Sequence, residues 1–296
     1  MIEPTAGPSR AVVLGGKTGL LGQSLVAVLR DKKWDVVAHG RDDADVLDSA
    51  ALERYLGDAA PEFVFNTIAY TQVDKAEDEP EEALRLNKAL PACLGRIARQ
   101  QGFWLVHYST DFVFDGRGQA PYQLSDEPNP QSVYGRTKLA GENALLEIGL
   151  PNLNIVRTAW LFGPGRKNFV KTILTLARQR PTLGVVHDQI GSPTYTPDLA
   201  LYSYELARRK VYGIFHLVNA GRASWCELAA EAVTLAELNC TVNAITSAEY
   251  PQQAKRPAYS VLATDKFTNV TGITPRPWPS ALREYVFQET AMWEEA

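Results

Sequence analysis

Short apolar runs and longer amphipathic stretches alternate along the first 220 residues of the chain. The apolar runs are bounded by turn residues and predict buried β-strands, and the stretches between them predict helices with one apolar face. The predicted strands are 11–14, 34–38, 62–66, 103–108, 154–157, 184–187 and 214–218. The predicted helices are about 20–30, 50–56, 80–101, 133–148 and 197–209. This alternation predicts an α/β fold built on a Rossmann-like, doubly wound parallel sheet.

The pattern changes beyond residue 160, where glycine and proline interrupt the chain at 163–165, 191–193, 256–257 and 275–279. Loop-rich material of this kind commonly forms a lid over a cleft at the carboxyl ends of the strands. We therefore expect a flexible leader over residues 1–10, a sheet domain over 11–160 to which later segments return, and a smaller C-terminal substrate-binding lobe over 161–296.

The composition argues against several classes of protein. The chain has 30 Lys and Arg residues against 34 Asp and Glu, a formal net charge of −4 and no basic cluster, so we expect no nucleic-acid partner. No apolar run approaches the roughly 20 residues that span a bilayer, so we expect no membrane segment. The three cysteines lack metal-type spacing and suit a reducing cytoplasm, and no two histidines are four residues apart. We therefore expect no metal among the site residues.

A glycine-rich segment, Leu14–Gly22, follows the first predicted strand and opens the first helix. Gly16, Gly19 and Gly22 are spaced so that backbone N–H groups can approach a pyrophosphate at the positive end of the helix. Leu20 and Leu21 follow the turn, and we include them with Gly16 and Gly19 among the cofactor-binding candidates. The alternative is an ordinary tight turn between strand and helix. Its position after the first strand favours dinucleotide binding, which makes 11–160 an NAD(P)-binding domain.

The end of the second strand bears on the choice of cofactor. Arg41 can pair with a 2′-phosphate in fork geometry, which favours NADPH. Asp42 and Asp43 follow and could bind ribose hydroxyls instead, so NADH stays possible. The alternative for Arg41 is a solvated cation in a turn.

Tyr134 and Lys138 lie four residues apart and share one face of a predicted helix. A lysine ammonium beside a phenol is expected to lower its pKa and so to prepare Tyr134 for proton exchange near neutral pH. Thr110 precedes Tyr134 by 24 residues and ends the fourth predicted strand, where its hydroxyl could bond the same substrate oxygen. The alternative is that Ser109, Thr110 and Asp111 only form a turn or helix cap. We take Thr110, Tyr134 and Lys138 as the catalytic candidates.

Several ordered blocks of this sequence resemble the extended short-chain dehydrogenase/reductase family and, within it, the dTDP-4-dehydrorhamnose reductases. The blocks are GKTG (16–19), NTIAYTQVDKAE (66–77), YSTDFVFDG (108–116), YGRTK (134–138), RTAWLFG (157–163), DQIGSPT (188–194) and RPAYS (256–260). The resemblance covers about residues 11–287. Single blocks are widespread among sugar-nucleotide enzymes, whereas VDKAE together with DQIGSP is more specific.

The resemblance implies NADPH-dependent reduction of the 4-keto group of dTDP-4-dehydro-6-deoxy-L-mannose to dTDP-L-rhamnose. Hydride would pass from the nicotinamide to C4, and Tyr134 would protonate the alkoxide. Thr110 would bond the ketone oxygen, and Lys138 would tune Tyr134 and hold the nicotinamide ribose.

The same resemblance implies further contacts to both ligands. Ala69, Tyr70 and Tyr108 would line the cofactor, and Asp45 and Val46 would meet the adenine. Thr71, Val73, Thr110, Asp111 and Trp160 would face the sugar, although Trp160 could equally be a core aromatic. Gln189 and Arg256 stay outside the predicted site, because Gln189 could be a turn-stabilising amide and Arg256 a surface charge.

Other functions remain open at this point. A non-catalytic NADP-binding subunit, similar to the regulatory β subunit of methionine adenosyltransferase, shares several of these blocks. A sugar-nucleotide epimerase or dehydratase is a third interpretation, but a dehydratase usually has Glu after Asp111, where this chain has Phe112. A homodimer is possible. Mg²⁺ at a dimer interface near Glu284, Glu289, Glu294 and Glu295 is unsupported, because a solvated tail accounts for these residues better.

Overall fold

A six-stranded parallel sheet forms the centre of the protein in this computed structural model, which describes residues 8–294. Its strands are β1 (Arg10–Leu14), β2 (Asp35–Ala38), β3 (Phe63–Asn66), β4 (Trp104–Thr110), β5 (Leu153–Thr158) and β10 (Gly213–His216). They lie in the order β10-β5-β4-β3-β1-β2, and every adjacent pair is parallel. The predicted α/β class and doubly wound sheet are confirmed.

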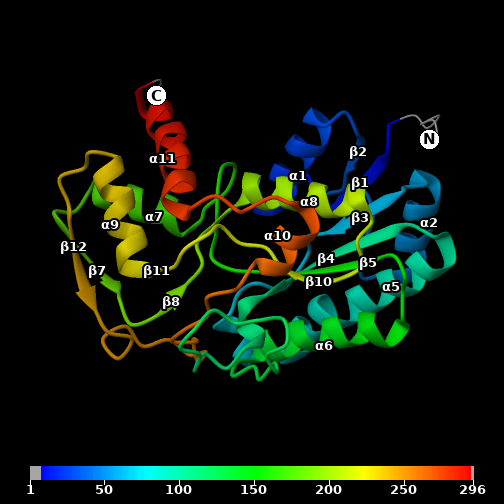
Figure 1. Ribbon diagram of the computed structural model, residues 1–296, viewed down its shortest axis with the longest axis horizontal. Helices are drawn as coiled ribbons and strands as arrows, with labels where there is room; N and C mark the ends of the chain where they lie inside the picture. The colour runs from blue at the N-terminus through cyan, green and yellow to red at the C-terminus, as the bar shows by residue number, and fades with distance from the viewer. Residues whose placement is uncertain (1–7, 295–296) are drawn as a thin grey trace.

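Helices cover both faces of the sheet (Figure 1). Helices α1 (Leu20–Asp31) and α8 (Thr196–Arg209) pack on one face, and α2 (Ser49–Ala59), α5 (Leu90–Gln101) and α6 (Val133–Ile148) pack on the other. Successive strand residues point to opposite faces of the sheet, so Val13 packs toward α1 and α8 while Leu14 packs toward α2 and α5. Burial on both faces explains the apolar runs of strands such as β1 and β3, whereas β4 and β5 also carry buried polar side chains.

The segment predicted as one helix over 80–101 contains three elements. They are α4 (Pro80–Leu84), a π-helical turn η1 (Arg85–Ala89) and α5. A short helix α3 (Lys75–Asp78) precedes them, and a 3₁₀ turn η2 (Asp111–Val113) follows β4.

Strands β7 (Thr182–Val186) and β12 (Thr241–Ile245) and helices α7 (Phe169–Ala177) and α9 (Trp225–Leu235) lie beside the sheet, at the left of Figure 1. The predicted strand 184–187 is β7, and it pairs in parallel with β12 outside the central sheet. Helices α7 and α9 pack against this pair through Ile173, Leu183 and Val233. The short strands are β6 (Leu161–Phe162), β8 (Ile190–Gly191), β9 (Thr194–Tyr195) and β11 (Ala223–Ser224).

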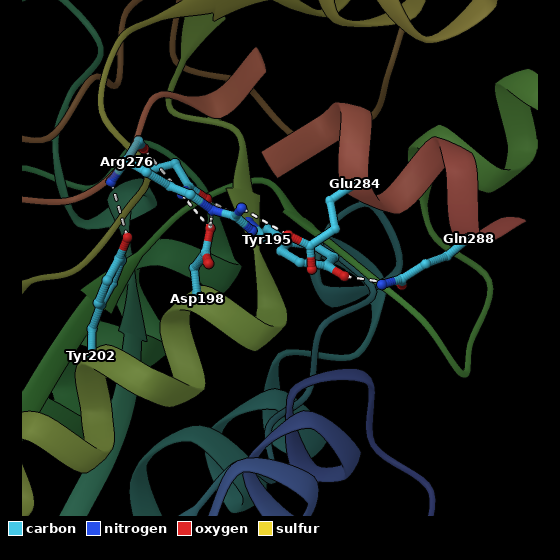
Figure 2. A network of polar contacts seen from close by, with 7 residues as sticks. Tyr195, Asp198, Tyr202, Arg276, Glu284 and Gln288 are labelled. Carbon is cyan, nitrogen blue, oxygen red and sulfur yellow. Dashed lines mark hydrogen bonds and ion pairs between the residues drawn. The ribbon is translucent and has the colours of Figure 1, made fainter. Parts of the chain in front are cut away.

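The C-terminal segment, with α10 (Asp265–Thr271) and α11 (Trp278–Glu294), is tied to α8 by a polar network (Figure 2). Arg276 Nε donates to Asp198 Oδ2 at 2.7 Å, and Arg276 Nη1 donates to Glu284 Oε2 at 2.7 Å. The backbone N–H of Arg276 donates to the Tyr202 hydroxyl at 3.1 Å. One arginine thus joins α8, the loop before α11 and α11 itself.

The boundaries drawn at residues 10 and 160 remain predictions. Residues 1–7 of the expected leader lie outside the described residues, and Arg10 is the first residue of β1. From the second part of the chain, α8 and β10 belong to the sheet layers. No helix within residues 8–294 is long and apolar enough to cross a bilayer.

Candidate functional site

A cleft of about 1910 Å³ opens at the carboxyl ends of the parallel strands. One wall is formed by the segments that follow β1, β2, β3, β4 and β5. The other wall is formed by residues from 160–189 and 245–257 together with Trp225. Every predicted site residue lines this cleft except Gly16. This is where ligands bind in doubly wound sheets.

The glycine-rich turn shapes one end of the cleft. Gly15 has a φ of +81° and accepts a hydrogen bond from the N–H of Gly19 at 2.8 Å. A Cβ at residue 22 would collide with the Gly15 carbonyl, so glycine there lets α1 start directly against the turn. Gly16 faces the core instead, where its N–H donates to Val13 O at 3.0 Å. The N-cap of α1, Gly19, has no side chain to satisfy the first N–H groups, which suits a phosphate group.

Two charged residues after β2, Arg41 and Asp43, differ in how they are bonded. Arg41 is exposed in the cleft, and no ion pair within the described residues includes it. Asp43 accepts from Lys17 Nζ and from the N–H of Gly40, each at 2.6 Å, and these bonds hold the pKa of its carboxyl below the usual value. Asp43 is therefore already occupied by partners within the chain.

Tyr70 is held by two residues that sequence reasoning missed. The side chain of Asn87, fully buried in the π-helical turn, accepts from Tyr70 N at 2.9 Å and donates to Tyr70 O at 3.2 Å. It also donates to Thr137 Oγ1 on α6 at 3.0 Å. The Tyr70 hydroxyl donates to Glu79 Oε2 at 2.6 Å, and this hydrogen bond is the main cause that raises the pKa of Tyr70 to about 12.

Thr110 ends β4, Asp111 begins η2, and both residues are buried. The Thr110 hydroxyl accepts from the N–H of Phe112 at 3.2 Å, as the cap of η2, and donates to Asp111 Oδ1 at 3.0 Å. Asp111 Oδ2 is buried with no partner within the described residues, and desolvation raises the pKa of this carboxyl to about 6. Thr110 therefore caps η2 and lines the cleft at the same time.

Tyr134 and Lys138 lie on one face of α6 and line the cleft, but their electrostatics differ from the prediction. Burial raises the pKa of Tyr134 to about 12, with smaller opposing effects from Thr110 and Arg256. Lys138 Nζ donates to the backbone oxygen of Tyr108 at 2.6 Å, and burial lowers the pKa of Lys138 to about 8. The expected lowering of the Tyr134 pKa by Lys138 was wrong, because desolvation of the phenol dominates.

A buried ion pair joins β5 to α6, the helix that carries Tyr134 and Lys138. Arg157 on β5 donates to Glu142 on α6 through Nε at 3.0 Å and Nη2 at 2.7 Å, and both side chains are almost completely buried. Glu142 also accepts a hydrogen bond from the Ser109 hydroxyl, and its charge partly offsets the lowering of the Lys138 pKa. This pair fixes the end of β4 against α6.

Trp160 lies in an aromatic wall of the cleft. Its backbone has a φ of +48°, which is uncommon for a bulky residue. Its indole stacks on Trp225 with ring centroids 3.5 Å apart and planes 3° from parallel, and Phe169 packs against Trp225 at 4.6 Å. Sequence reasoning found Trp160 but missed Trp225 and Phe169, which come from later segments.

The two residues that were kept out of the predicted site also line the cleft. Arg256 Nη2 donates to Asp74 Oδ2 at 2.6 Å, and its guanidinium lies 5.8 Å from the centre of the Phe112 ring. Gln189 donates to Ser247 Oγ at 2.9 Å, which fits the alternative of a turn-stabilising amide. Arg256 is thus a cleft cation rather than a surface charge.

Two of the four acidic residues considered for Mg²⁺, Glu284 and Glu289, are paired with cations of the chain. Glu284 is bonded to Arg276 and Glu289 to Lys171 at 2.9 Å, while Glu295 lies outside the described residues. Across residues 8–294 there is no group of three His, Cys, Asp or Glu side chains that could hold an ion.

Comparisons with known proteins agree with this geometry. The family model for the RmlD substrate binding domain matches residues 10–291. A probable dTDP-4,6-dihydroxy-2-methyloxan-3-one 4-ketoreductase of Streptomyces antibioticus is 41% identical, over 92% of this chain and 93% of that protein. A dTDP-4-dehydrorhamnose reductase of Aggregatibacter actinomycetemcomitans is 37% identical, over 92% and 97%.

A solved structure extends the likeness to the fold. The dTDP-4-dehydrorhamnose reductase of Bacillus anthracis str. Ames, in complex with NADP, superimposes with a TM-score of 0.91 at 30% identity and covers 95% of this chain and 99% of that one. Because the family model and these relatives span almost the whole chain, the protein belongs to the RmlD substrate-binding-domain family.

Proposed function

We propose that this protein is an NADPH-dependent reductase that converts the 4-keto group of dTDP-4-dehydrorhamnose to the alcohol of dTDP-L-rhamnose. The observation that carries the proposal is the meeting of Thr110, Tyr134 and Lys138 in the same cleft as the glycine-rich turn. The names of the relatives, most of them reductases of dTDP-linked keto sugars, support the substrate class.

The residues present fit a dinucleotide. The turn leaves the first N–H groups of α1 without a side-chain cap, and the Arg41 guanidinium is unpaired where a 2′-phosphate would lie. Gly19, Leu20 and Leu21 would surround the pyrophosphate, Asp45 and Val46 the adenine, and Ala69, Tyr70 and Tyr108 the rest of the cofactor. Bound NADPH supplies the hydride. Since Asp43 is paired with Lys17, Arg41 favours NADPH over NADH.

Tyr134 acts as the proton donor. A pKa of about 12 keeps the phenol protonated at neutral pH, which is the form that a reduction consumes when it protonates a developing alkoxide. Lys138 holds its ammonium at the Tyr108 carbonyl, from which it can also bond a ribose hydroxyl. Thr110 would hydrogen-bond the ketone oxygen.

The sugar would lie between the two walls of the cleft. Thr71, Val73 and Asp111 line the sheet side, and the Trp160–Trp225 stack lines the opposite side. The unpartnered Oδ2 of Asp111 can accept from a sugar hydroxyl.

The test is consumption of NADPH and of NADH with a panel of dTDP-linked 4-keto sugars that includes dTDP-4-dehydrorhamnose. We expect the highest kcat/KM with that sugar and NADPH, and a loss of about 10²- to 10⁴-fold in Tyr134→Phe. Full turnover in Tyr134→Phe would disprove the mechanism. Preference for another sugar of the panel would move the substrate toward that of the Streptomyces antibioticus relative. No turnover, with tight NADP binding and a co-purifying synthetase, would support the regulatory alternative.

The assembly and the cellular location are also proposals. We propose a homodimer and take Phe287 and Met292 of α11, which are 54% and 49% exposed, as candidates for its interface. Light scattering behind size exclusion measures this directly. A cytoplasmic location is supported by the three free thiols of the chain.

A further inference from the structure

The loop that follows β6 crosses the cleft to the glycine-rich turn. Gly165 in this loop has a φ of +92°, and a side chain at this position would collide with Gln23 in the first turn of α1. Next to it, Arg166 Nη1 donates to the backbone oxygen of Thr18 at 2.8 Å. A segment from the second half of the chain therefore places a guanidinium on the turn that precedes α1.

Most of the hydrogen-bonding capacity of Arg166 is unused. A guanidinium carries five N–H donors, and the Thr18 carbonyl takes one of them. The side chain is exposed, lines the cleft beside Thr18, Gly19 and Leu20, and belongs to no ion pair within the described residues. It can bond an anion without leaving its present position.

The cation that the turn itself carries is already paired. Lys17 is held by Asp43 at 2.6 Å, and the N-cap residue Gly19 has no polar side chain. The N–H groups at the start of α1 therefore supply partial positive charge, and Arg166, bonded to Thr18, places a full positive charge beside them.

We propose that Arg166 binds the pyrophosphate of the dinucleotide and so holds the cofactor between the N-terminus of α1 and the loop after β6. This inference rests on the proposed function only in taking the cofactor to be a dinucleotide. Arg166 is a binding residue and takes no part in the chemistry.

The test measures the dissociation constants of NADPH and NADH by fluorescence titration, without any sugar, for the wild type, Arg166→Gln, Arg166→Lys and Arg54→Gln. A lost charge-assisted bond corresponds to an increase in Kd of about tenfold to a hundredfold. We expect this increase for both dinucleotides in Arg166→Gln and a smaller one in Arg166→Lys, which keeps the charge but loses the fork. Arg54, which is exposed on α2 and does not line the cleft, is the matched control, and Arg54→Gln should change Kd by less than about threefold.

Four results would overturn the inference. Equal effects of Arg166→Gln and Arg54→Gln would indicate nonspecific charge attraction. A loss confined to NADPH, matched by weaker competition from 2′-AMP, would place Arg166 at the 2′-phosphate instead. Unchanged binding in Arg166→Gln would remove the contact altogether and leave the reductase proposal intact, whereas a wild type that binds neither dinucleotide would end both.

Discussion

Two acidic groups in the cleft, Asp111 and Tyr134, have raised pKa values for the same physical reason, which is desolvation. For Tyr134 the shift preserves the proton that the proposed reaction uses. For Asp111 it brings the carboxyl close to the physiological range, so that its ionisation affects the stability of the fold.

The first prediction concerns Asp111→Asn. Burial raises the carboxyl pKa from the usual 3.8 to about 6 in the folded protein. The folded state therefore binds the proton more tightly, and the associated stability is complete below pH 3.8 and is lost as pH rises through 6. Between pH 4 and 7 the free energy of unfolding of the wild type should fall by up to about 3 kcal/mol relative to that of Asp111→Asn. Urea unfolding of both proteins across this pH range measures the difference.

Asp58→Asn provides the control, because Asp58 is exposed on α2. Its stability should follow that of the wild type at every pH. A constant gap between Asp111→Asn and the wild type from pH 4 to 7 would contradict the proposed effect of burial.

Among the elements, the π-helical turn η1 is an irregularity that positions a residue of the cleft. The extra residue in the turn directs Asn87 inward, where its amide satisfies both backbone groups of Tyr70. π-Helical turns of this kind often occur at functional sites.

Asn87→Ala is the second prediction. The substitution leaves the N–H and the C=O of Tyr70 and the Thr137 hydroxyl without their present partner in a buried region, which should destabilise the protein by about 3 kcal/mol. Chemical denaturation gives the value. Asn143→Ala on neighbouring α6, at an exposed position, should cost less than about 0.5 kcal/mol. Similar costs for the two variants would refute the role of Asn87.

The elements also show which parts of the structure a sequence can predict. Strands such as Phe63–Asn66 are buried on both faces, so their apolar runs were recognisable, and the site residues at their carboxyl ends followed. Strand β12 is largely exposed and finds its partner β7 far away in the chain, so it has no comparable pattern. The π-helical turn differs from an α-helix by one residue of spacing, which the periodicity of 80–101 does not reveal.

Two of the missed residues, Trp225 and Arg166, lie far along the chain from the motifs they serve. Trp225 stacks on Trp160, and Arg166 reaches Thr18, through pairings that only the fold creates. The pKa of Tyr134 was predicted in the wrong direction for a related reason, since spacing shows the position of Lys138 but not the burial of the phenol.

On the scale of the whole molecule, the network around Arg276 joins the C-terminal helix to the sheet layers (Figure 2). Asp198 receives the Arg276 guanidinium and the Asn219 amide, the latter at 2.6 Å. The attachment of α11 thus depends on polar groups as well as on its apolar face, which includes Leu282 and Tyr285.

The third prediction is that Arg276→Ala destabilises the protein by about 1 to 2 kcal/mol, because two charge-assisted contacts are lost from a half-exposed site. Arg276→Lys should recover only part of this, since a single ammonium cannot bridge both carboxylates with fork geometry. Thermal unfolding measures all three proteins. Arg283→Ala, an exposed arginine on the same helix, is the control and should be neutral. Full recovery in Arg276→Lys would argue against the bridging role.

The stacked Trp160 and Trp225 have one further consequence. Two indoles with ring centroids 3.5 Å apart and planes nearly parallel couple their strong electronic transitions, so the pair should give adjacent bands of opposite sign in the far-ultraviolet circular dichroism spectrum. Both rings line the cleft, and a sugar nucleotide that touches either of them would alter those bands. The protein thus carries its own optical reporter of substrate binding, which can be read without a label and before any turnover.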